Sequence, residues 1–494
     1  MASASFGACV LCRRAAVKIS SRGMSAAAGA QSQGDFLSGE PHRKHPGVTN
    51  LKTLRLPDEL QAAARTIINR APVTQLTDRS RTLANFLWSR KRAVEDWTLR
   101  RKAVSLEKEL WDEAKEKRGD MDEQLLEERI RKKVFSELRK TTYHWTPMKY
   151  DEELAVVYMA ARLAGGYAAV RRAINEIKKR DPSFAPKSLL DFGSGLGTVV
   201  WASHSCWGDT LKEMVCVDSS GPMNVLAERL LKGDEERAEP HIKQVYFRQF
   251  LPVSPKVKAS TLVFLSDIFL YPRSDFSSKL GGRAAVTVLR LSLQVQFDLV
   301  AAAFTLSELL SVKDREEAVL TLWRKTGSYL VLVENGTKEG HQMLMEARDA
   351  VLKKLDKTVH DSRPASVFAP CPHDLSCPKL TVGPTAPCNF QQMYHPLPLP
   401  GHKERQTEKF SYLILTRARP AQADGADWAR LIAPVQRRTR HVHCRACCSD
   451  GRLQHLVVTA RKHSRDVYRC ARSSDWGDQL PTAPRGDDDQ SDSE

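Results

Sequence analysis

The chain has 494 residues, enough for roughly three domains of about 150 residues, and its 41% hydrophobic and 27% charged residues exclude wholesale disorder. It contains no apolar run approaching the roughly 18 residues that a membrane-spanning helix needs. The excess of 76 Lys and Arg over 59 Asp and Glu gives a net charge of +17, which favours nucleic acid or an anionic membrane surface over acidic protein partners.

The N-terminal segment 1–34 contains no Asp or Glu, and it carries Arg13, Arg14, Lys18 and Arg22 among Ala and Ser residues. This composition is typical of a mitochondrial transit peptide, which we expect here; a disordered basic arm is the alternative. A reducing mitochondrial compartment also agrees with thiols that remain free to bind a metal.

Residues 41–180 are predicted to form a basic helical domain. Apolar residues such as Leu83, Phe86 and Leu87 recur at spacings of three and four, and basic runs at 90–92 and 131–133 lie between such positions. These runs are either solvated helix faces or contacts to RNA phosphates.

Residues 181–420 are predicted to form an α/β domain with a doubly wound, mainly parallel sheet. Short apolar runs alternate there with helical patterns, which is typical of a parallel sheet covered by helices on both faces. The segment 409–416 is expected to be an antiparallel closing strand, and 258–295 is treated as an insertion. The other expected strands are 188–192, 214–218, 297–301 and 329–334, and the expected helices are 197–212, 221–232, 313–325 and 340–355.

A glycine-rich loop follows the first of these strands. Asp191 precedes three alternating glycines, Gly193, Gly195 and Gly197, and the second strand ends in another acid, Asp218. The spacing fits neither a dinucleotide fingerprint nor a phosphate-binding Walker loop. It resembles motif I of class I methyltransferases, which implies that the glycines line S-adenosyl-L-methionine and that Asp218 holds its ribose; a tight turn without a ligand is the alternative.

The residues after the expected fourth strand do not support methyl transfer. The chain continues there as 302–308, Ala-Ala-Phe-Thr-Leu-Ser-Glu, without the Asn/Asp-Pro-Pro-aromatic loop of base-directed amino methyltransferases and without a Pro-Cys nucleophile. We therefore predict no catalytic residue, although an active rRNA methyltransferase remains the alternative function.

Seven of the eleven cysteines lie between residues 371 and 470. Thiolates gathered from distant loops can hold a tetrahedral zinc ion or a [4Fe–4S] cluster. Among these seven, a single Cys-x-x-Cys pair, Cys444 and Cys447, has the spacing of a zinc knuckle, and the wide, irregular spacing of the others favours iron–sulfur. Spacing leaves three alternatives open: a cluster, zinc, or buried free thiols.

Taken together, these motifs resemble a family of methyltransferase-like assembly factors of the mitochondrial small ribosomal subunit. The resemblance extends from about residue 41 to 476, and its most specific stretches are 140–145, 158–163, 191–197, 368–373 and 441–451. It implies a protein of the mitochondrial matrix with a methyltransferase fold and a [4Fe–4S] cluster. It also implies that the protein acts on the rRNA and proteins of the maturing small subunit, binds S-adenosylmethionine and does not transfer its methyl group.

The same resemblance assigns the cluster ligands to Cys371, Cys377, Cys388 and Cys447, the last because the family motif places its cysteine shortly before Asp450 and Gly451. The Cys-rich metal-binding region is accordingly expected to span 365–476, followed by a disordered acidic tail at 477–494. The 258–295 insertion departs from the family pattern. We expect the chain to act as a monomer.

Overall fold

The computed structural model describes residues 43–481, except 44, 46, 117–122, 144, 236, 252–295, 355–362, 382–385 and 418–427. The expected transit peptide, the expected insertion and residues 482–494 of the expected tail lie outside the described residues.

The centre of the molecule is an eight-stranded mixed sheet with the order β3-β2-β1-β4-β5-β8-β6, in which β7 also pairs with β8. Strands β1 to β5 are parallel, and β8 runs antiparallel to β5, as the closing strand was predicted to do. This is the methyltransferase-like, doubly wound fold expected from the sequence. The strands are β1 (Ser188–Phe192), β2 (Glu213–Val217), β3 (Val245–Arg248), β4 (Phe297–Ala303), β5 (Thr326–Asn335), β6 (Ser366–Ala369), β7 (Phe390–Tyr394) and β8 (Gln406–Thr416).

Helices cover both faces of this sheet, which explains why its strands read as continuous apolar runs. Alternate residues of a strand enter two different cores: Leu189 packs with the helices of one face and Leu190 with those of the other. The first face is covered by α2 (Asp58–Arg70), α6 (Glu152–Arg180), α7 (Thr198–Trp207) and α8 (Gly221–Leu231), and the second by α11 (Val312–Lys325) and α12 (Lys338–Lys354).

The sequence predicted that residues 41–180 form a separate helical domain, but helix α6 packs into the α/β domain. Its N-terminus is capped by Asp151, whose carboxylate accepts a hydrogen bond from the Leu154 backbone at 2.7 Å. Gly165 lets the helix approach β8, because a Cβ atom there would overlap the Glu408 carboxylate. Helices α2 and α6 share one hydrophobic core with the sheet, and they are therefore part of the α/β domain.

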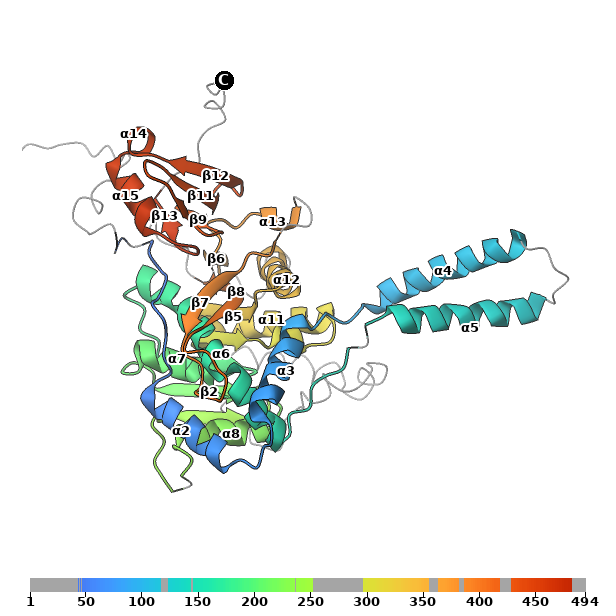
Figure 1. Cartoon of the computed structure of the whole chain (residues 1–494), viewed down its shortest axis with the longest axis horizontal. Coiled ribbons are helices and arrows are strands. Elements are labelled where there is room, and N and C mark those ends of the chain that lie inside the picture. Colours follow the sequence, from blue (N-terminus) through green and yellow to red (C-terminus); the bar gives the residue numbers. More distant parts are fainter. Residues whose placement is uncertain are drawn as a thin grey trace, which may run out of the picture.

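One part of the helical region does leave the body. Helices α4 (Asp96–Glu116) and α5 (Glu123–Thr141) form an antiparallel hairpin that projects away from the sheet, and α3 (Leu76–Ser89) precedes it along the body (Figure 1). Trp97 and Phe135 on this hairpin are 59% and 64% exposed. Among the described residues, no helix is both long and apolar enough to cross a membrane.

The edge of the sheet next to β8 is built from two strands in succession. Ala369, at the end of β6, lies opposite Ile414, and Phe390, at the start of β7, lies opposite Phe410 further along the same strand. Between them, residues 370–381 and 386–389 lie outside the sheet and include the short helix α13 (Pro378–Thr381). Three of the four predicted ligand cysteines lie on this excursion.

A smaller module follows, with its own sheet and core. It lies beyond the β6 edge of the main sheet (Figure 1). Its strand order is β10-β11-β9-β13, with β12 pairing to β11. The acidic tail was expected to begin at 477, but Gln479 and Leu480 are buried in β13, which pairs antiparallel with β9; this boundary was wrong because backbone pairing outweighs the polar composition. The elements are β9 (Ala429–Leu431), β10 (Gln436–Arg437), β11 (Val442–Cys447), β12 (Leu453–Val458), α14 (Ala460–His463), α15 (Arg465–Ser473) and β13 (Gln479–Leu480).

Candidate functional site

The glycine loop between β1 and α7 adopts a conformation that favours glycine. Gly193, Gly195 and Gly197 have φ values of +67°, +50° and +71°. The Gly193 backbone N–H donates to the Val217 carbonyl at 2.7 Å, which fastens the loop to the end of β2. A Cβ atom at Gly193 would overlap the Thr305 side chain, whereas one at Gly197 would meet open space, so Gly197 is the glycine beside which a ligand has room.

Asp218 holds this loop in place. One carboxylate oxygen accepts the backbone N–H of Gly195 at 2.8 Å, and the other accepts that of Ser220 at 2.9 Å. Burial raises the pKa of Asp218, and these two backbone donors oppose the rise by stabilising the anion. Each oxygen can accept more than one hydrogen bond, so the residue fits the ribose-binding role that the sequence suggested.

Asp191, by contrast, has no hydrogen-bond partner for its side chain in the part of the chain that the structure describes. Its side chain is buried, and neither carboxylate oxygen accepts a hydrogen bond among the described residues. Burial raises its pKa well above the ordinary value, and the nearby charge of Asp218 adds to the rise. A buried acceptor without a donor carries a free-energy penalty, so a ligand with a hydrogen-bond donor that reached Asp191 would gain from pairing with it.

The loop after β4 is committed to internal contacts. The Thr305 hydroxyl donates to the Phe192 carbonyl at 3.1 Å, and Glu308 pairs with Arg90 at 2.7 Å. Glu334, at the end of β5, accepts the Ser307 backbone N–H at 3.3 Å. These contacts give the loop a structural role. Thr305 and Glu308, which follow the methyltransferase-like β4, are each engaged with a protein partner.

The four predicted ligand cysteines come together in space. Cys371, Cys377 and Cys388, from the excursion between β6 and β7, line one cavity with Cys447 from β11 of the smaller module. The remaining lining is Pro370, Pro378, Lys379, Arg430, Ile432 and Leu453. The cavity therefore lies where the excursion meets the smaller module.

The electrostatics of these thiols show that they are close neighbours. Burial raises the pKa of Cys371 to about 12 and that of Cys388 to about 11. Burial raises the pKa of Cys447 further, with smaller contributions in the same direction from Cys371, Cys388 and Cys377. Uncharged thiols are thus favoured until a positively charged centre binds them as thiolates.

The four thiols are of a donor type that suits two kinds of centre, a zinc ion or an iron–sulfur cluster. In the described part of the chain, no group of three or more His, Cys, Asp or Glu side chains has the arrangement of a site for a single metal ion. A tetrahedral zinc ion with Zn–S bonds of about 2.3 Å would bring its sulfur ligands to roughly 3.8 Å from each other. A [4Fe–4S] cluster separates its thiolates more widely, because they bind different iron atoms, and the four cysteines of the cavity supply the donor type of either centre.

Several side chains beside this cavity were not found by sequence reasoning. His341 contacts the Cys377 sulfur at 3.7 Å, and His373 contacts the Cys447 sulfur at 3.4 Å. Arg430 lines the cavity, and both Arg348 and Arg430 act to lower the pKa of Cys371 against the effect of burial. Of these residues, His373 lies in the stretch 368–373 that the family resemblance includes, whereas His341, Arg348 and Arg430 lie in no motif and are brought to the cysteines only by the folded chain.

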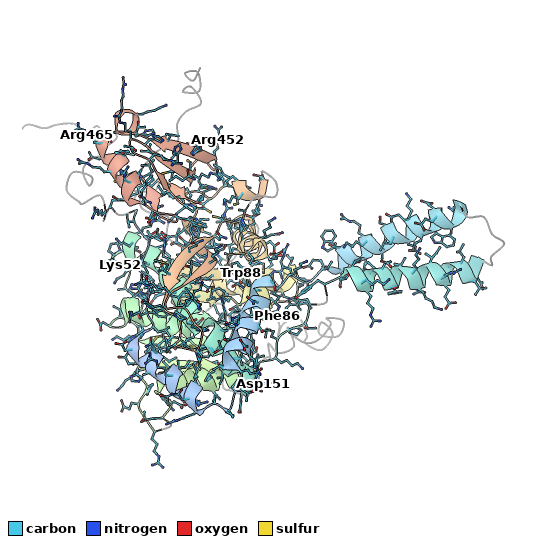
Figure 2. The ribbon with its side chains drawn as sticks, viewed as in Figure 1. Lys52, Phe86, Trp88, Asp151, Arg452 and Arg465 are labelled. Atoms are coloured by element: carbon cyan, nitrogen blue, oxygen red, sulfur yellow. The ribbon has the colours of Figure 1, made fainter. Side chains whose placement is uncertain are left out.

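The surface of the smaller module is strongly basic. Residues 428–481 contain 11 Lys and Arg against 4 Asp and Glu. Arg445 extends from the exposed face of β11, and Arg452 and Arg465 lie on the side of the module away from the main sheet (Figure 2). On the same sheet, His443 and His455 stack with ring centroids 5.2 Å apart. A cationic face of this kind attracts a polyanion.

The strand order and the glycine loop define the class: this is a methyltransferase-like protein in which a cysteine-lined cavity joins the α/β domain to a basic module. The family model described as "Mitochondrial small ribosomal subunit Rsm22" matches residues 152–481. The chain belongs to this family, as the sequence resemblance predicted.

Two curated relatives illustrate the match. The human "Ribosome assembly protein METTL17, mitochondrial" is 49% identical over 446 residues, which cover 90% of this chain and 87% of the relative. The "Rsm22-cox11 tandem protein 2, mitochondrial" of Schizosaccharomyces pombe is 31% identical over 232 residues, or 40% of this chain and 31% of the relative. Both are named as mitochondrial proteins, which is consistent with the mitochondrial matrix as the location of this chain.

Solved structures of methyltransferases are also similar to the chain. A putative RNA methyltransferase of Pyrococcus horikoshii has a TM-score of 0.26 and 8% identity, and covers 51% of this chain and 83% of its own. The magnesium protoporphyrin IX methyltransferase of Synechocystis has a TM-score of 0.28 and 12% identity, over 58% and 94%. The fold assignment itself rests on the strand order described above.

Proposed function

We propose that this protein is an assembly factor of the mitochondrial small ribosomal subunit that binds rRNA and is held in its binding conformation by a [4Fe–4S] cluster. Family membership supports the ribosomal role. The single observation that carries the structural part is the meeting of four cysteines, from two separate parts of the chain, at one cavity.

The cluster ligands in this proposal are Cys371, Cys377, Cys388 and Cys447. Once bound, the cluster would supply Fe–S bonds that cross-link the excursion after β6 to β11, and the redox chemistry of iron is not needed for that role. The protein's own contribution is to hold the excursion and β11 together beside cationic side chains. Metal binding to groups that are distant in sequence is folding free energy, so the basic module should be ordered only when the centre is in place.

The RNA partner follows from charge. The basic module carries a large excess of Lys and Arg, and the net charge of the whole chain is +17. Contacts between such a surface and phosphates release counterions, so we expect an affinity for rRNA that falls steeply with salt.

We further propose that the glycine loop binds S-adenosylmethionine without transferring its methyl group. The geometry of Gly197, Asp218 and the unpartnered Asp191 supports binding. The engaged groups after β4, Thr305 and Glu308, argue against transfer, because a methyltransferase must leave polar groups there free to orient its acceptor.

The test is to replace Cys377 with Ser in mitochondria and measure association of the protein with the small subunit on density gradients. We expect loss of iron and of association, because one missing thiolate leaves the cluster incomplete. The matched control is Cys206→Ser, a partly buried cysteine on α7 that does not line the cavity. Unchanged association and iron content in Cys377→Ser would refute the proposal.

The second candidate is an active rRNA methyltransferase, which the open space beside Gly197 favours. It predicts transfer of tritium from labelled S-adenosylmethionine to small-subunit rRNA, abolished by Asp218→Ala. Such a result would replace the non-catalytic role with a catalytic one. Binding of the cofactor without label in the RNA would support the role proposed here.

A further inference from the structure

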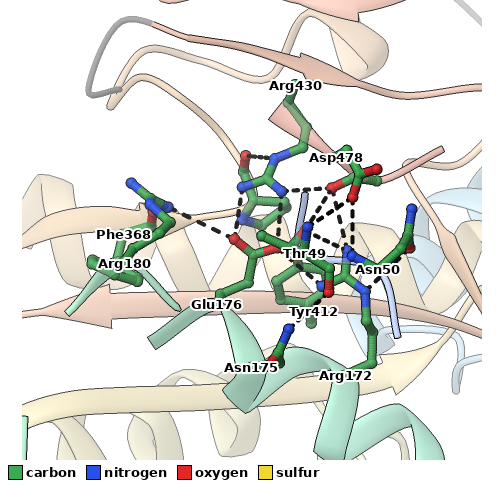
Figure 3. A network of polar contacts seen from close by, with 12 residues as sticks. Thr49, Asn50, Arg172, Asn175, Glu176, Arg180, Phe368, Tyr412, Arg430 and Asp478 are labelled. Atoms are coloured by element: carbon green, nitrogen blue, oxygen red, sulfur yellow. Dashed lines mark hydrogen bonds and ion pairs between the residues drawn. The ribbon is translucent and has the colours of Figure 1, made fainter. Parts of the chain in front are cut away.

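Arg430 connects the cysteine cavity to the rest of the molecule. It lies on β9 with 1% of its surface exposed, and its Nε donates to the carbonyl of Pro370, the residue before Cys371, at 2.9 Å. Its two terminal nitrogens donate to both carboxylate oxygens of Glu176 on α6, at 2.9 and 3.0 Å. One guanidinium thus holds the start of the cysteine excursion and the main helix of the α/β domain (Figure 3).

The same network includes the N-terminal arm and the end of the smaller module. Asp478, beside β13, accepts the backbone N–H groups of Thr49 and Asn50 at 2.8 and 3.0 Å. Arg172 on α6 donates to the Thr49 hydroxyl at 2.8 Å and to Glu176 at 3.0 Å. Segments more than 400 residues apart in sequence are therefore joined through one buried polar network (Figure 3).

The network carries more positive than negative charge. Arg172, Arg180 and Arg430 surround a single carboxylate, Glu176, and Asp478 is the other acid. Burial would raise the pKa of Glu176, but Arg430 and Arg172 hold it well below its ordinary value, so Glu176 is ionised. Burial raises the pKa of Asp478, against the opposing effects of Arg172 and of backbone N–H donors. Three guanidinium groups thus face two carboxylates.

An anion at the cysteine cavity would balance this excess. Arg430 lines the cavity itself, and its Nε donates to the carbonyl of Pro370, which directly precedes Cys371. Four thiolates around an oxidised [4Fe–4S] core carry a net charge of about −2. A buried charge is stable only when it is paired, so four neutral thiols would leave Arg430 less well compensated than a bound cluster would.

We propose that Arg430 is a positioning residue that couples occupancy of the four-cysteine centre to docking of the basic module on the α/β domain. The inference rests on the proposed cluster. The cluster compensates the charge of Arg430. Arg430, on β9, in turn binds Glu176 on α6 and the carbonyl of Pro370 at the start of the excursion. By reciprocity, docking of the module must stabilise the cluster by the same free energy as the cluster stabilises docking.

The first test uses the full wild-type chain, purified without oxygen, and compares amide hydrogen exchange before and after removal of iron by a chelator. Iron loss should speed exchange in peptides 45–50, 428–431 and 476–480, and it should leave β1 and β4 unchanged. Equal exchange in the two forms of an iron-containing protein would overturn the coupling and leave the proposed cluster intact. Protein that never contains iron would overturn the cluster and the coupling together.

The second test separates charge from hydrogen-bond geometry at Arg430. Arg430→Gln removes the charge, so the cluster should be lost to a chelator about tenfold faster, and its reduction potential should shift to more negative values. Arg430→Lys keeps the charge but loses the set of guanidinium hydrogen bonds to Glu176 and Pro370. The reduction potential should then stay near that of wild type, while amide exchange in 428–431 becomes insensitive to iron. The matched control is Arg162→Lys, which alters a buried ion pair between α6, the helix that also carries Glu176, and Glu408 on β8.

Wild-type potential and cluster retention in Arg430→Gln would overturn the proposal. If Arg430→Gln does not fold, Arg430→Lys and the wild-type exchange comparison decide the question by themselves. A purely structural role would destabilise the chain in both Arg430 variants without moving the potential of either, and that outcome would also reject it.

Discussion

Glu334 offers the sharpest prediction about the α/β domain. It lies at the end of β5 with 1% of its surface exposed; one carboxylate oxygen accepts the Ser307 backbone N–H, and the other has no partner among the described residues. Burial raises its pKa from 4.5 to about 7, against the stabilising effect of Ser307. The folded protein therefore keeps this proton until about pH 7, while the unfolded chain releases it from about pH 4.5.

Because the folded state binds more protons in this window, its stability falls as the pH rises from 4.5 to 7. A shift of about 2.5 units corresponds to roughly 3 kcal/mol when fully developed, and about 2 kcal/mol of this should appear between pH 5 and 7.5. Glu334→Gln replaces the titratable carboxyl group with an amide of nearly the same shape. The free energy of unfolding of Glu334→Gln, relative to that of wild type, should therefore rise by about 2 kcal/mol between pH 5 and 7.5.

The assay is urea unfolding of both proteins at the two pH values, followed by circular dichroism. Glu153→Gln, an exposed residue in the first turn of α6, is the control and should follow wild type at both. A stability difference between Glu334→Gln and wild type that does not change with pH would show that the carboxyl is ionised throughout, and would refute the reasoning.

Three further predictions concern the cofactor loop, the core and the RNA surface. Asp218→Ala removes two charge-assisted hydrogen bonds, one to Gly195 of the glycine loop and one to Ser220 before α8, so it should weaken S-adenosylmethionine binding in calorimetry by at least about tenfold; unchanged affinity would contradict the role of Asp218. Arg162→Met leaves Glu408 buried without its partner and should lower the free energy of unfolding by about 3–5 kcal/mol in urea titrations; a loss below about 1 kcal/mol would contradict this. Arg438→Gln with Arg445→Gln should reduce the salt dependence of binding to single-stranded rRNA fragments, by about 0.7 in the log–log slope per lost phosphate contact, and an unchanged slope would place the RNA elsewhere.

Much of the α/β fold could be predicted because its signals are local. Each buried strand is a short apolar run bounded by polar residues, and the helices between the strands have their own periodicity. Even the antiparallel course of the last strand was predicted correctly, at 409–416 within β8. The errors came where local composition competes with distant pairing: Gln479 and Leu480 belong to a segment that is polar and acidic overall, yet they add a strand to β9.

The residues of the candidate site were likewise predicted only in part. Family motifs identified four cysteines, which the structure brings to one cavity, and whether they bind a [4Fe–4S] cluster stays a prediction. Arg430 could not have been found, because its partner Glu176 lies 254 residues away and neither residue belongs to a motif. The splitting of the sheet edge into β6 and β7, which presents the cysteines, depends on pairing with β8 and has no signature in the sequence.

The most direct measurement is the metal content of the full chain purified without oxygen, read together with its visible absorption. Bound iron of about four atoms per chain, with a brown colour near 400 nm that disappears in Cys371→Ser and persists in Cys206→Ser, is the predicted result. One zinc atom per chain, or protein that contains no metal and still associates with the small subunit, would contradict the account.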